Sequence, residues 1–345
     1  MKTYTVAVAG AMGLVGSTMV QILEEYNFPV NCLKLLETEG LVGKKVQFHG
    51  QGVYTELCTP EAFEGVDIAL FGTPASVSAE MCPEAARRGA IAIDNSSYFR
   101  MNPHIPLIVP EVNPEDISWQ KGIIANPNCT TIGTILVLKP IHMVSRIRRL
   151  VASTYQATSG AGINGPLELM KQCAEIAAGR DPSPPSVFIY QIAHNVIPLI
   201  DALEADGYTK EEWKMVNETH KMLHDDTIRI TNTNVRVPVV VGHSVSCNIV
   251  TEEKITVEQA RAILEKAPGV KVVDDRGHLE FPQPLKVAGC DITHVGRIRE
   301  DFSTENGLNL FLASDNVRKG AASNAVQIAQ LLVREGQVEK WQRKS

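Results

Sequence analysis

Hydrophobic and polar positions alternate along the first third of the chain so as to predict strands and helices in turn. Short apolar runs predict buried strands, and apolar residues every three or four positions predict helices. Strands are expected at Thr3–Ala9, Leu33–Leu36, Ile68–Phe71, Ala90–Asp94 and Gly122–Ala125, and helices at Val15–Tyr26, Ser78–Arg88 and Thr131–Met143. This alternation is typical of a parallel, doubly wound sheet, and it predicts an α/β fold here.

Beyond about residue 148 the pattern changes to runs of strands and helices, which predicts an α+β second domain. Strands are expected at Arg148–Ala157, Val235–Val241, Ser246–Glu252, Thr293–Glu300 and Leu308–Ala313, and helices at Pro166–Ala178, Lys210–His224, Val257–Lys266 and Val317–Val333. We expect Val235–Val241 and Ser246–Glu252 to pair with each other, and residues 180–187 to form an exposed loop. The last predicted helix has apolar and small residues at a spacing of three to four, so it could pack on either domain.

Composition narrows the class of protein. A chain of 345 residues is long for one hydrophobic core, which favours two domains, and a net charge of −6 offers nothing for a polyanion such as nucleic acid. No basic run favours an anionic membrane, and no segment is apolar enough to span one. The seven cysteines are scattered without a CxxC pair, which argues against a disulfide framework and a zinc site. With no signal peptide at the N-terminus, we expect a cytoplasmic protein with no metal.

A glycine-rich turn follows the first predicted strand and opens the first predicted helix. It reads Gly10-Ala11-Met12-Gly13-Leu14-Val15-Gly16. Glycines allow a tight turn and a close approach of the backbone, so that helix N-terminal amides can hold a pyrophosphate. We therefore predict a nicotinamide dinucleotide site at Gly10, Met12, Gly13, Leu14 and Val15. The alternative is a plain turn between strand and helix.

The end of the second strand bears on the choice between NAD and NADP. An acidic residue there binds the adenine ribose diol of NAD, whereas an arginine accepts the 2′-phosphate of NADP. The segment reads Leu35-Leu36-Glu37-Thr38-Glu39-Gly40, so Glu37 and Glu39 would repel a 2′-phosphate while Thr38, Lys44 and Lys45 could reach one. The alternative is that both glutamates face solvent.

Cys129 is the candidate nucleophile, because it lies between a proline-containing turn and a predicted helix. The positive end of a helix favours a thiolate, and free amides of the turn can stabilise an oxyanion. The alternative is a buried, unreactive thiol, which we prefer for the other six cysteines. Among the nine histidines, His243 stands out as a proton carrier, because it follows Gly242 at the end of a β-branched run.

Five motifs in this order resemble one enzyme family over nearly the whole chain. They are GAMGLVG at 10–16, NPNCTT around Cys129, TYQATSGAG at 154–162, NETHK at 217–221 and VRVPVVVGHS at 235–244. Together they resemble aspartate-β-semialdehyde dehydrogenase, of the glyceraldehyde-3-phosphate dehydrogenase-like fold. The resemblance implies a Rossmann domain over residues 1–130 that the terminal helix (316–345) rejoins, and a catalytic and dimerising domain over residues 131–315.

The resemblance also implies a reaction and a set of roles. The reaction is the reversible, nicotinamide-dependent reductive dephosphorylation of L-aspartyl 4-phosphate to L-aspartate 4-semialdehyde, on the route to lysine, threonine and methionine. Cys129 would form the thioester, His243 would be the acid/base and Gln156 would orient the acyl group. Arg236, expected on the same strand as His243, would bind the substrate carboxylate, and Glu218 its ammonium. The phosphate would be bound by Lys221 and Arg100, and the cofactor also by Ser159, Gly160 and Asn316.

One place departs from the family. Many members carry a serine and an arginine after the second strand, where this chain has Thr38 and Gly40. NADP is the family default, but these residues favour NAD or use of both cofactors.

Two alternative functions stay open. One is an acyl-phosphate reductase resembling N-acetyl-γ-glutamyl-phosphate reductase, whose substrate has no ammonium for Glu218, and the other is a catalytically idle nicotinamide sensor. A homodimer through the second domain is implied by the family alone.

Overall fold

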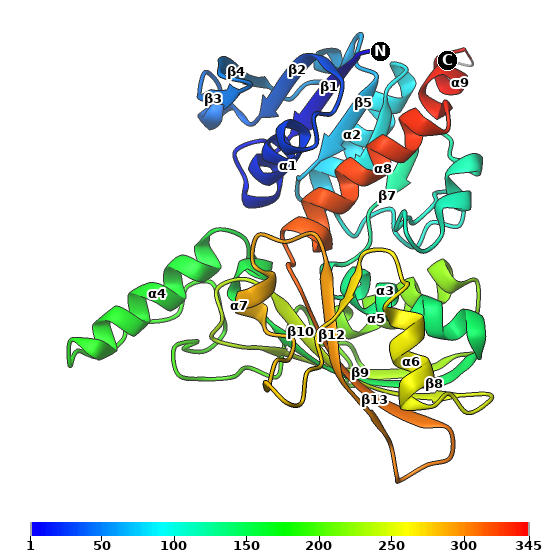
Figure 1. The fold of residues 1–345 in the computed structure, drawn as a ribbon. Helices are drawn as coiled ribbons and strands as arrows, with labels where there is room; N and C mark the ends of the chain where they lie inside the picture. The colour runs from blue at the N-terminus through cyan, green and yellow to red at the C-terminus, as the bar shows by residue number, and fades with distance from the viewer. Residues whose placement is uncertain (1, 344–345) are drawn as a thin grey trace. The chain divides into compact units, whose positions relative to one another are not determined.

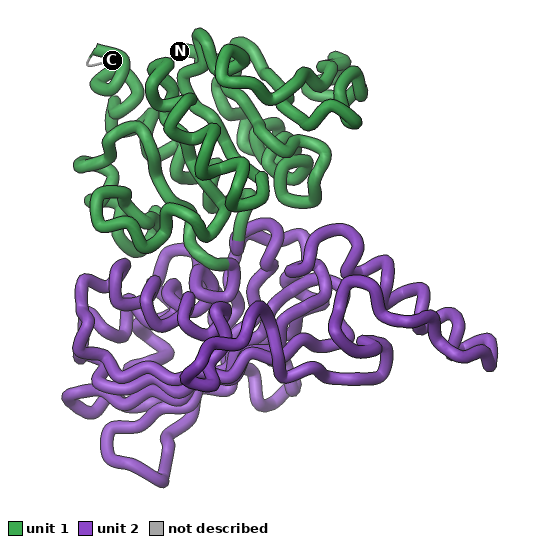
Figure 2. The backbone as a smooth tube through the Cα atoms, turned by 180° about the vertical axis from the view of Figure 1, so that it is seen from behind, with its two compact units in different colours: residues 1–128, 321–345 green, residues 129–320 purple. Residues whose placement is uncertain are grey.

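The structure of the protein is a computed structural model that describes residues 2–343. The chain divides into two compact units, residues 1–128 with 321–345 and residues 129–320 (Figure 2). Each unit is built on its own sheet, one of seven strands and one of six. The two are described separately below.

Unit 1 contains a sheet in which all neighbouring strands are parallel except β3 and β4. Its order is β3-β4-β2-β1-β5-β6-β7. The strands are β1 (Tyr4–Ala9), β2 (Val30–Glu37), β3 (Lys45–Phe48), β4 (Gln51–Leu57), β5 (Ile68–Phe71), β6 (Ile91–Asp94) and β7 (Ile123–Ala125). The predicted doubly wound α/β fold is confirmed, and of these strands the sequence pattern missed β3 and β4.

The helices of unit 1 are α1 (Leu14–Glu25), α2 (Ala75–Arg87), α8 (Ser323–Arg334) and α9 (Gln337–Gln342). In Figure 1, α8 from the end of the chain lies beside α1, and the two helices are in contact. From β1 the chain moves across the sheet to β2, whereas from β5 it moves the other way to β6. The carboxyl ends of β1 and β5 therefore form the switch point where ligands bind in doubly wound sheets.

Unit 2 contains a mixed sheet with the order β11-β12-β13-β10-β8-β9. Its strands are β8 (Ile147–Gln156), β9 (Arg229–Arg236), β10 (His243–Thr251), β11 (Val270–Val272), β12 (Thr293–Glu300) and β13 (Gly307–Ser314). Its helices are α3 (Cys129–Val144), α4 (Asn164–Ala177), α5 (Lys210–Leu223), α6 (Val257–Leu264) and α7 (Pro284–Val287). Strands and helices follow one another in blocks here, so the predicted α+β character is confirmed.

Helices α3, α5 and α6 cover one face of this sheet. Helix α5 begins with a capping box, in which Thr209 accepts a hydrogen bond from the Glu212 amide and the Glu212 carboxylate accepts one from the Thr209 amide. On the other face, Tyr155 is 40% exposed and its ring lies 6.2 Å from that of the partly buried Phe311. That face therefore presents aromatic side chains to the surroundings of the unit.

The predicted pairing of Val235–Val241 with Ser246–Glu252 is wrong. The strand ends at Arg236, and β8 lies between β9 and β10, which are not neighbours. Pro238 has no amide proton to donate to a ladder, and the residues after it instead accept hydrogen bonds from the Thr158 and Ser159 amides. Arg236 and His243 are consequently on different strands, and His243 begins a strand rather than ending one.

The predicted last helix, Val317–Val333, is divided in two. A π-helical turn runs from Arg318 to Ala322, and the α-helix α8 starts at Ser323. Such turns are uncommon and are frequent at functional sites. Among residues 2–343, no helix combines the length and the apolar character that crossing a membrane requires.

Candidate active site

One edge of the unit 2 sheet gathers residues that are far apart in sequence. Strands β8 and β9 are parallel and end together, with Gln156 opposite Arg236. Strand β10 is antiparallel to β8 and begins at this same edge, where His243 pairs with Ser314 at the end of β13. The register thus places Arg236, Gln156, His243 and Ser314 on adjacent strands along one line.

Cys129 is the first residue of α3 and is partly buried. A Cβ built on Gly320, in the π-helical turn, would lie 3.0 Å from Cys129 Cβ, so the turn packs directly on the cysteine. Burial lowers the pKa of Arg236, and electrostatic interactions with Glu211 and then Cys129 offset part of that lowering. Cys129 therefore lies close enough to the sheet edge to interact with its cation.

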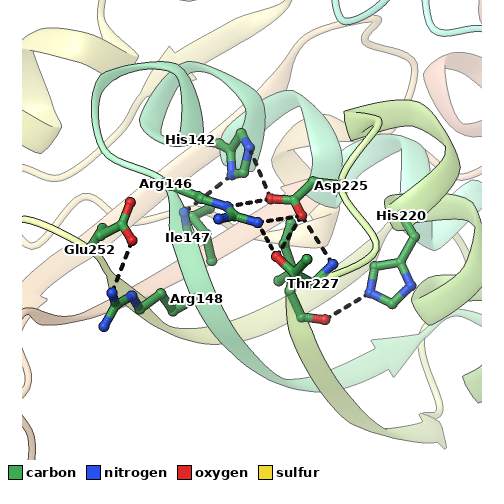
Figure 3. Close-up of polar contacts among 9 residues, drawn as sticks. His142, Arg146, Ile147, Arg148, His220, Asp225, Thr227 and Glu252 are labelled. Carbon is green, nitrogen blue, oxygen red and sulfur yellow. Dashed lines mark hydrogen bonds and ion pairs between the residues drawn. The ribbon is translucent and has the colours of Figure 1, made fainter.

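The far end of α3 is held by a polar cluster (Figure 3). Arg146 donates two hydrogen bonds to the Asp225 carboxylate, from Nε at 2.7 Å and from Nη2 at 2.9 Å. His142, on the last turn of α3, lies 3.7 Å from the same carboxylate and accepts a hydrogen bond from the Ile147 amide. The helix that begins at Cys129 is thus attached at its other end to the segment after α5.

His243 is buried with one ring nitrogen committed to the backbone. The Ala157 amide donates a hydrogen bond of 3.0 Å to Nδ1, so in the neutral ring the proton is on Nε2. Burial, and then the positive charge of Arg236, hold the pKa of His243 well below its usual range. Within residues 2–343, Nε2 is buried and has no hydrogen-bond partner. The ring is therefore a neutral donor with a proton available at Nε2.

Arg236 is buried beside His243 and is held in place at one end. Its Nη1 donates a 2.6 Å hydrogen bond to the Ala157 carbonyl, and its guanidinium lies 5.8 Å from the Phe188 ring centre. A Cβ on Gly160 would lie 2.6 Å from Nη1, so a larger residue there would displace the guanidinium. The remaining guanidinium donors suit a planar carboxylate.

Gln156 contacts a carboxylate that the sequence analysis did not identify. Its Nε2 donates to Glu211 Oε1 at 3.3 Å, and Glu211 also binds Lys214 at 2.9 Å. Glu211 is 7% exposed, and its charge offsets part of the lowering that burial imposes on the pKa of Arg236. Its place on α5, two helical turns before Glu218 and on the same face, was the signal that could have identified it.

Glu218 and Lys221 lie three residues apart on this helix. Glu218 is buried and Lys221 is partly buried, in contrast to the ordinary solvated surface charge. Their predicted contacts with substrate ammonium and phosphate stay predictions. Arg100 belongs to unit 1, where it is buried and donates to the carbonyls of Asn126 at 2.9 Å and Asn95 at 2.7 Å.

Two residues predicted to bind the cofactor link the strand edge to a loop. The Asn316 side chain bonds the Ser159 hydroxyl at 2.9 Å, and its Oδ1 accepts a 2.9 Å hydrogen bond from the Gly242 amide. Gly242 precedes His243 directly. Asn316 therefore contacts the loop that carries Ser159 and Gly160 and also the backbone that leads into the buried histidine.

The glycine-rich turn of unit 1 lies at the switch point of its sheet. Gly10 has φ +76°, and a Cβ there would lie 2.7 Å from the Gly72 carbonyl oxygen, which follows β5. A Cβ on Gly16 would lie 2.0 Å from the Gly10 carbonyl oxygen. The turn leaves the first amides of α1, those of Leu14 and Val15, without helical partners and suited to a pyrophosphate.

Glu37 and Glu39, which the sequence could not orient, differ sharply. Glu37 is 6% exposed, and its Oε1 accepts a 2.6 Å hydrogen bond from the Met12 amide. Thr38, Glu39 and Gly40 are exposed. The Met12 amide thus binds the end of β2, and the Glu37 charge sits between that strand and the turn. Among residues 2–343, no three His, Cys, Asp or Glu side chains form a group that could hold a metal ion.

Comparison with known proteins agrees with this architecture. The sequence model of the semialdehyde dehydrogenase NAD-binding domain matches residues 5–120, and that of the semialdehyde dehydrogenase dimerisation domain matches residues 138–319. The protein therefore has the domain of a nicotinamide-dependent oxidoreductase, as predicted.

Individual relatives match over almost their whole length. The aspartate-semialdehyde dehydrogenase of Aquifex aeolicus (strain VF5) is 48% identical over 336 residues, which cover 96% of this chain and 99% of the relative. That of Bacillus subtilis (strain 168) is 45% identical, covering 95% and 96%. The structure of aspartate semialdehyde dehydrogenase II from Vibrio cholerae, complexed with ASA, has a TM-score of 0.94 at 44% identity and covers 97% and 99%. The chain belongs to the aspartate-semialdehyde dehydrogenase family.

Proposed function

We propose that this protein catalyses the reversible reductive dephosphorylation of L-aspartyl 4-phosphate to L-aspartate 4-semialdehyde and phosphate. Family membership at this identity supports the reaction. The structural observation that carries it is the junction of Cys129, at the start of a helix, with the strand edge of Gln156, Arg236 and His243. A thiolate beside a guanidinium and a buried imidazole suits acyl transfer.

The chemistry begins at sulfur. Cys129 Sγ attacks the C4 acyl carbon, the bond from that carbon to the phosphate oxygen breaks, and inorganic phosphate leaves a thioester on Cys129. A nicotinamide cofactor, when bound, supplies the hydride that reduces this thioester carbon. The carbon–sulfur bond then breaks, which releases the aldehyde and restores the thiolate.

His243 acts through Nε2. Because the Ala157 amide occupies Nδ1, the proton that His243 can offer is on Nε2. A hydrogen bond from this atom stabilises the negative charge that develops on the substrate oxygen in both acyl steps. The low pKa of the ring keeps it neutral, and therefore a fixed donor, at physiological pH.

Substrate recognition rests on opposite charges. Arg236 uses Nη1 for the Ala157 carbonyl, and we assign its other donors to the substrate α-carboxylate. Glu218 would bind the ammonium, and Lys221 with Arg100 the phosphate, as the resemblance implies. Glu211 holds Gln156, which supports a role for Gln156 in orienting the acyl group.

The test is a spectrophotometric assay with aspartate semialdehyde, phosphate and either nicotinamide cofactor. We expect reduced cofactor to form only when phosphate is present, and we expect Cys129→Ala to abolish its formation while the protein still binds cofactor. Phosphate-independent turnover, or turnover by Cys129→Ala, would contradict the proposal.

For the cofactor, we propose that the protein uses NAD as well as NADP, or prefers NAD. The buried carboxylate of Glu37 at the end of β2 would disfavour a 2′-phosphate, and Gly40 supplies no cation to bind one. The measurement is kcat/KM with each cofactor under the same conditions. A hundredfold higher kcat/KM with NADPH than with NADH would contradict this cofactor proposal.

For assembly, we propose a homodimer through the face of the unit 2 sheet that carries Tyr155 and Phe311. The match to a dimerisation domain over this unit supports it, as does the exposed Tyr155 beside the partly buried Phe311 on the face opposite α3. Light scattering should give twice the mass of one chain, and Phe311→Arg should shift the measured mass toward that of the monomer.

We place the protein in the cytoplasm, where its seven free thiols would remain reduced.

A further inference from the structure

The segment that follows β13, Asp315 and Asn316, contacts both sides of the proposed active site. Asn316 binds the Gly242 amide next to His243. Asp315 is 2% exposed and has no role in the chemistry above. A buried carboxylate is tolerated only with hydrogen-bond donors, and the donors to the Asp315 carboxylate lie in two separate segments.

The first set of donors is the π-helical turn. Asp315 Oδ1 accepts hydrogen bonds from the Val317 amide at 2.8 Å and from the Arg318 amide at 2.9 Å. The Asp315 carbonyl accepts a third, from the Gly320 amide, at 2.9 Å. One residue therefore fixes both the start of this turn and the position of Gly320 within it.

Gly320 passes this constraint to Cys129. Its missing Cβ would lie 3.0 Å from Cys129 Cβ and 3.3 Å from Cys129 Cα, so the two residues are packed backbone against side chain. A shift of the turn must either press on Cys129 or leave a gap beside it. The position of the sulfur thus depends on the turn that Asp315 holds.

The second donor is the Gly289 amide, which binds Asp315 Oδ2 at 2.8 Å. Gly289 closes the loop that begins with α7, and Pro284 of that helix packs on Gly242. A Cβ on Gly242, whose φ is +94°, would lie 2.8 Å from Pro284. Gly242 is therefore held by the Asn316 side chain on one side and by Pro284 on the other, directly before His243.

We propose that Asp315 is a positioning residue that sets the place of Cys129 relative to His243. Its Oδ1 arm acts through the π-helical turn and Gly320, and its Oδ2 arm acts through Gly289, Pro284 and Gly242. The inference rests on the proposed function, because it takes these two side chains as the reacting pair. Since misplacement by about 1 Å can cost on the order of 100-fold in rate, a residue that touches no substrate can govern turnover.

The two arms can be separated chemically. Asp315→Asn keeps an oxygen for the Val317 and Arg318 amides but turns an NH₂ toward the Gly289 amide, so only the His243 arm is lost. Asp315→Ala removes both arms. Gly320→Ala presses directly on Cys129 and bypasses Asp315.

Asp274 offers a matched control. It is a buried aspartate of the same unit, 9% exposed, and it likewise accepts two backbone hydrogen bonds, from Arg297 at 2.9 Å and Ile298 at 3.2 Å. Its carboxylate also accepts a 2.8 Å hydrogen bond from Arg261 of α6, and none of these contacts includes Cys129 or His243. Asp274→Ala therefore reports what the loss of such a carboxylate does to stability alone.

The experiment measures Tm, kcat, KM and the pH dependence of iodoacetamide alkylation of Cys129 for all four variants. We expect kcat to fall roughly tenfold in Asp315→Asn and on the order of 100-fold in Asp315→Ala. The alkylation profile should stay as in the wild type for Asp315→Asn but change for Asp315→Ala and Gly320→Ala. Asp274→Ala should lower Tm while kcat stays within about twofold.

Equal losses of Tm in Asp315→Ala and Asp274→Ala, with unchanged kcat and alkylation in both, would overturn the proposal. If Asp315→Ala does not fold, an unchanged kcat in Asp315→Asn overturns it as well. Failure of the proposed function looks different, because the wild type would then show no phosphate-dependent turnover or Cys129→Ala would remain active.

Discussion

The two units bring functional residues together in different ways. In unit 1, the glycine-rich turn and Glu37 come from the first two strands of the chain, which are also neighbours in the sheet. In unit 2, Gln156, Arg236 and His243 come from three strands whose spatial order differs from their order in sequence. The glycine-rich turn proposed to bind the nucleotide is thus a local feature of the chain, whereas the residues proposed for the chemistry are brought together by strand pairing.

This difference determines which kind of substitution should disturb each site. A local site is sensitive to backbone space within one turn, because the same few residues form the whole feature. A site assembled from strand ends is sensitive to hydrogen bonds between segments, such as that from the Ala157 amide to His243. Substitutions in the glycine-rich turn should therefore affect cofactor binding without affecting the strand edge that holds His243.

The largest effect should come from removing His243. We expect His243→Ala to lower kcat about 10²–10⁴-fold with little change in cofactor binding, because His243 is not among the residues predicted to bind the cofactor. His243→Gln should recover part of this loss, since its amide can donate where Nε2 does. The measurements are kcat and the cofactor Kd, the latter by fluorescence titration, for the wild type and both variants.

The same residue makes a prediction about pH. Burial and Arg236 lower the pKa of His243, so the ring is already neutral on the alkaline side of that low value. The profile of kcat/KM should therefore show no rising limb near pH 6.5. A limb at that pH that disappears in His243→Gln would mean that the histidine works as a titrating base.

A smaller effect is expected from Gly16→Ala in unit 1. The new Cβ would lie 2.0 Å from the Gly10 carbonyl oxygen, so the turn must move. We expect the cofactor Kd to rise roughly tenfold or more, while the alkylation rate of Cys129 stays as in the wild type. Gly40→Ala is the control, because beyond its chain neighbours no heavy atom lies within 4 Å of the position that its Cβ would take. Equal effects of the two substitutions would refute the steric argument.

The smallest effect should come from Glu37→Gln. The amide oxygen can still accept the hydrogen bond from Met12, while the negative charge at the end of β2 is lost. We expect the ratio of kcat/KM for NADPH over NADH to rise several-fold. Glu39→Gln, at an exposed position, should leave the ratio close to that of the wild type. An unchanged ratio in both would remove Glu37 from the choice of cofactor.

The sequence predicted unit 1 better because its signals are local. Strands such as Ile68–Phe71 are fully buried and read as continuous apolar runs, and the glycines mark the turn without knowledge of the rest of the fold. The short strands β3 and β4 carry mostly exposed residues, so they left no such pattern.

In unit 2 the apolar pattern was misleading where it was strongest. The run from Val237 to Val241 looks like a strand, but Pro238 ends the ladder and the segment bonds a loop instead. The true strand, Arg229–Arg236, is largely polar. Spacing places Glu211 on the same face of α5 as Glu218, but its contact with Gln156 depends on how α5 packs beside the sheet.

The polar cluster at the far end of α3 has a consequence for storage and handling. The Arg146 guanidinium holds the pKa of Asp225 far below its usual range, and burial lowers that of His142. Both groups are therefore protonated more readily in the unfolded chain than in the folded one, so acidification lowers the free energy of unfolding. The loss begins below about pH 6.5 through His142 and continues in stronger acid through Asp225. Acidic buffers should therefore loosen the helix that carries Cys129, and neutral or mildly alkaline ones should preserve it.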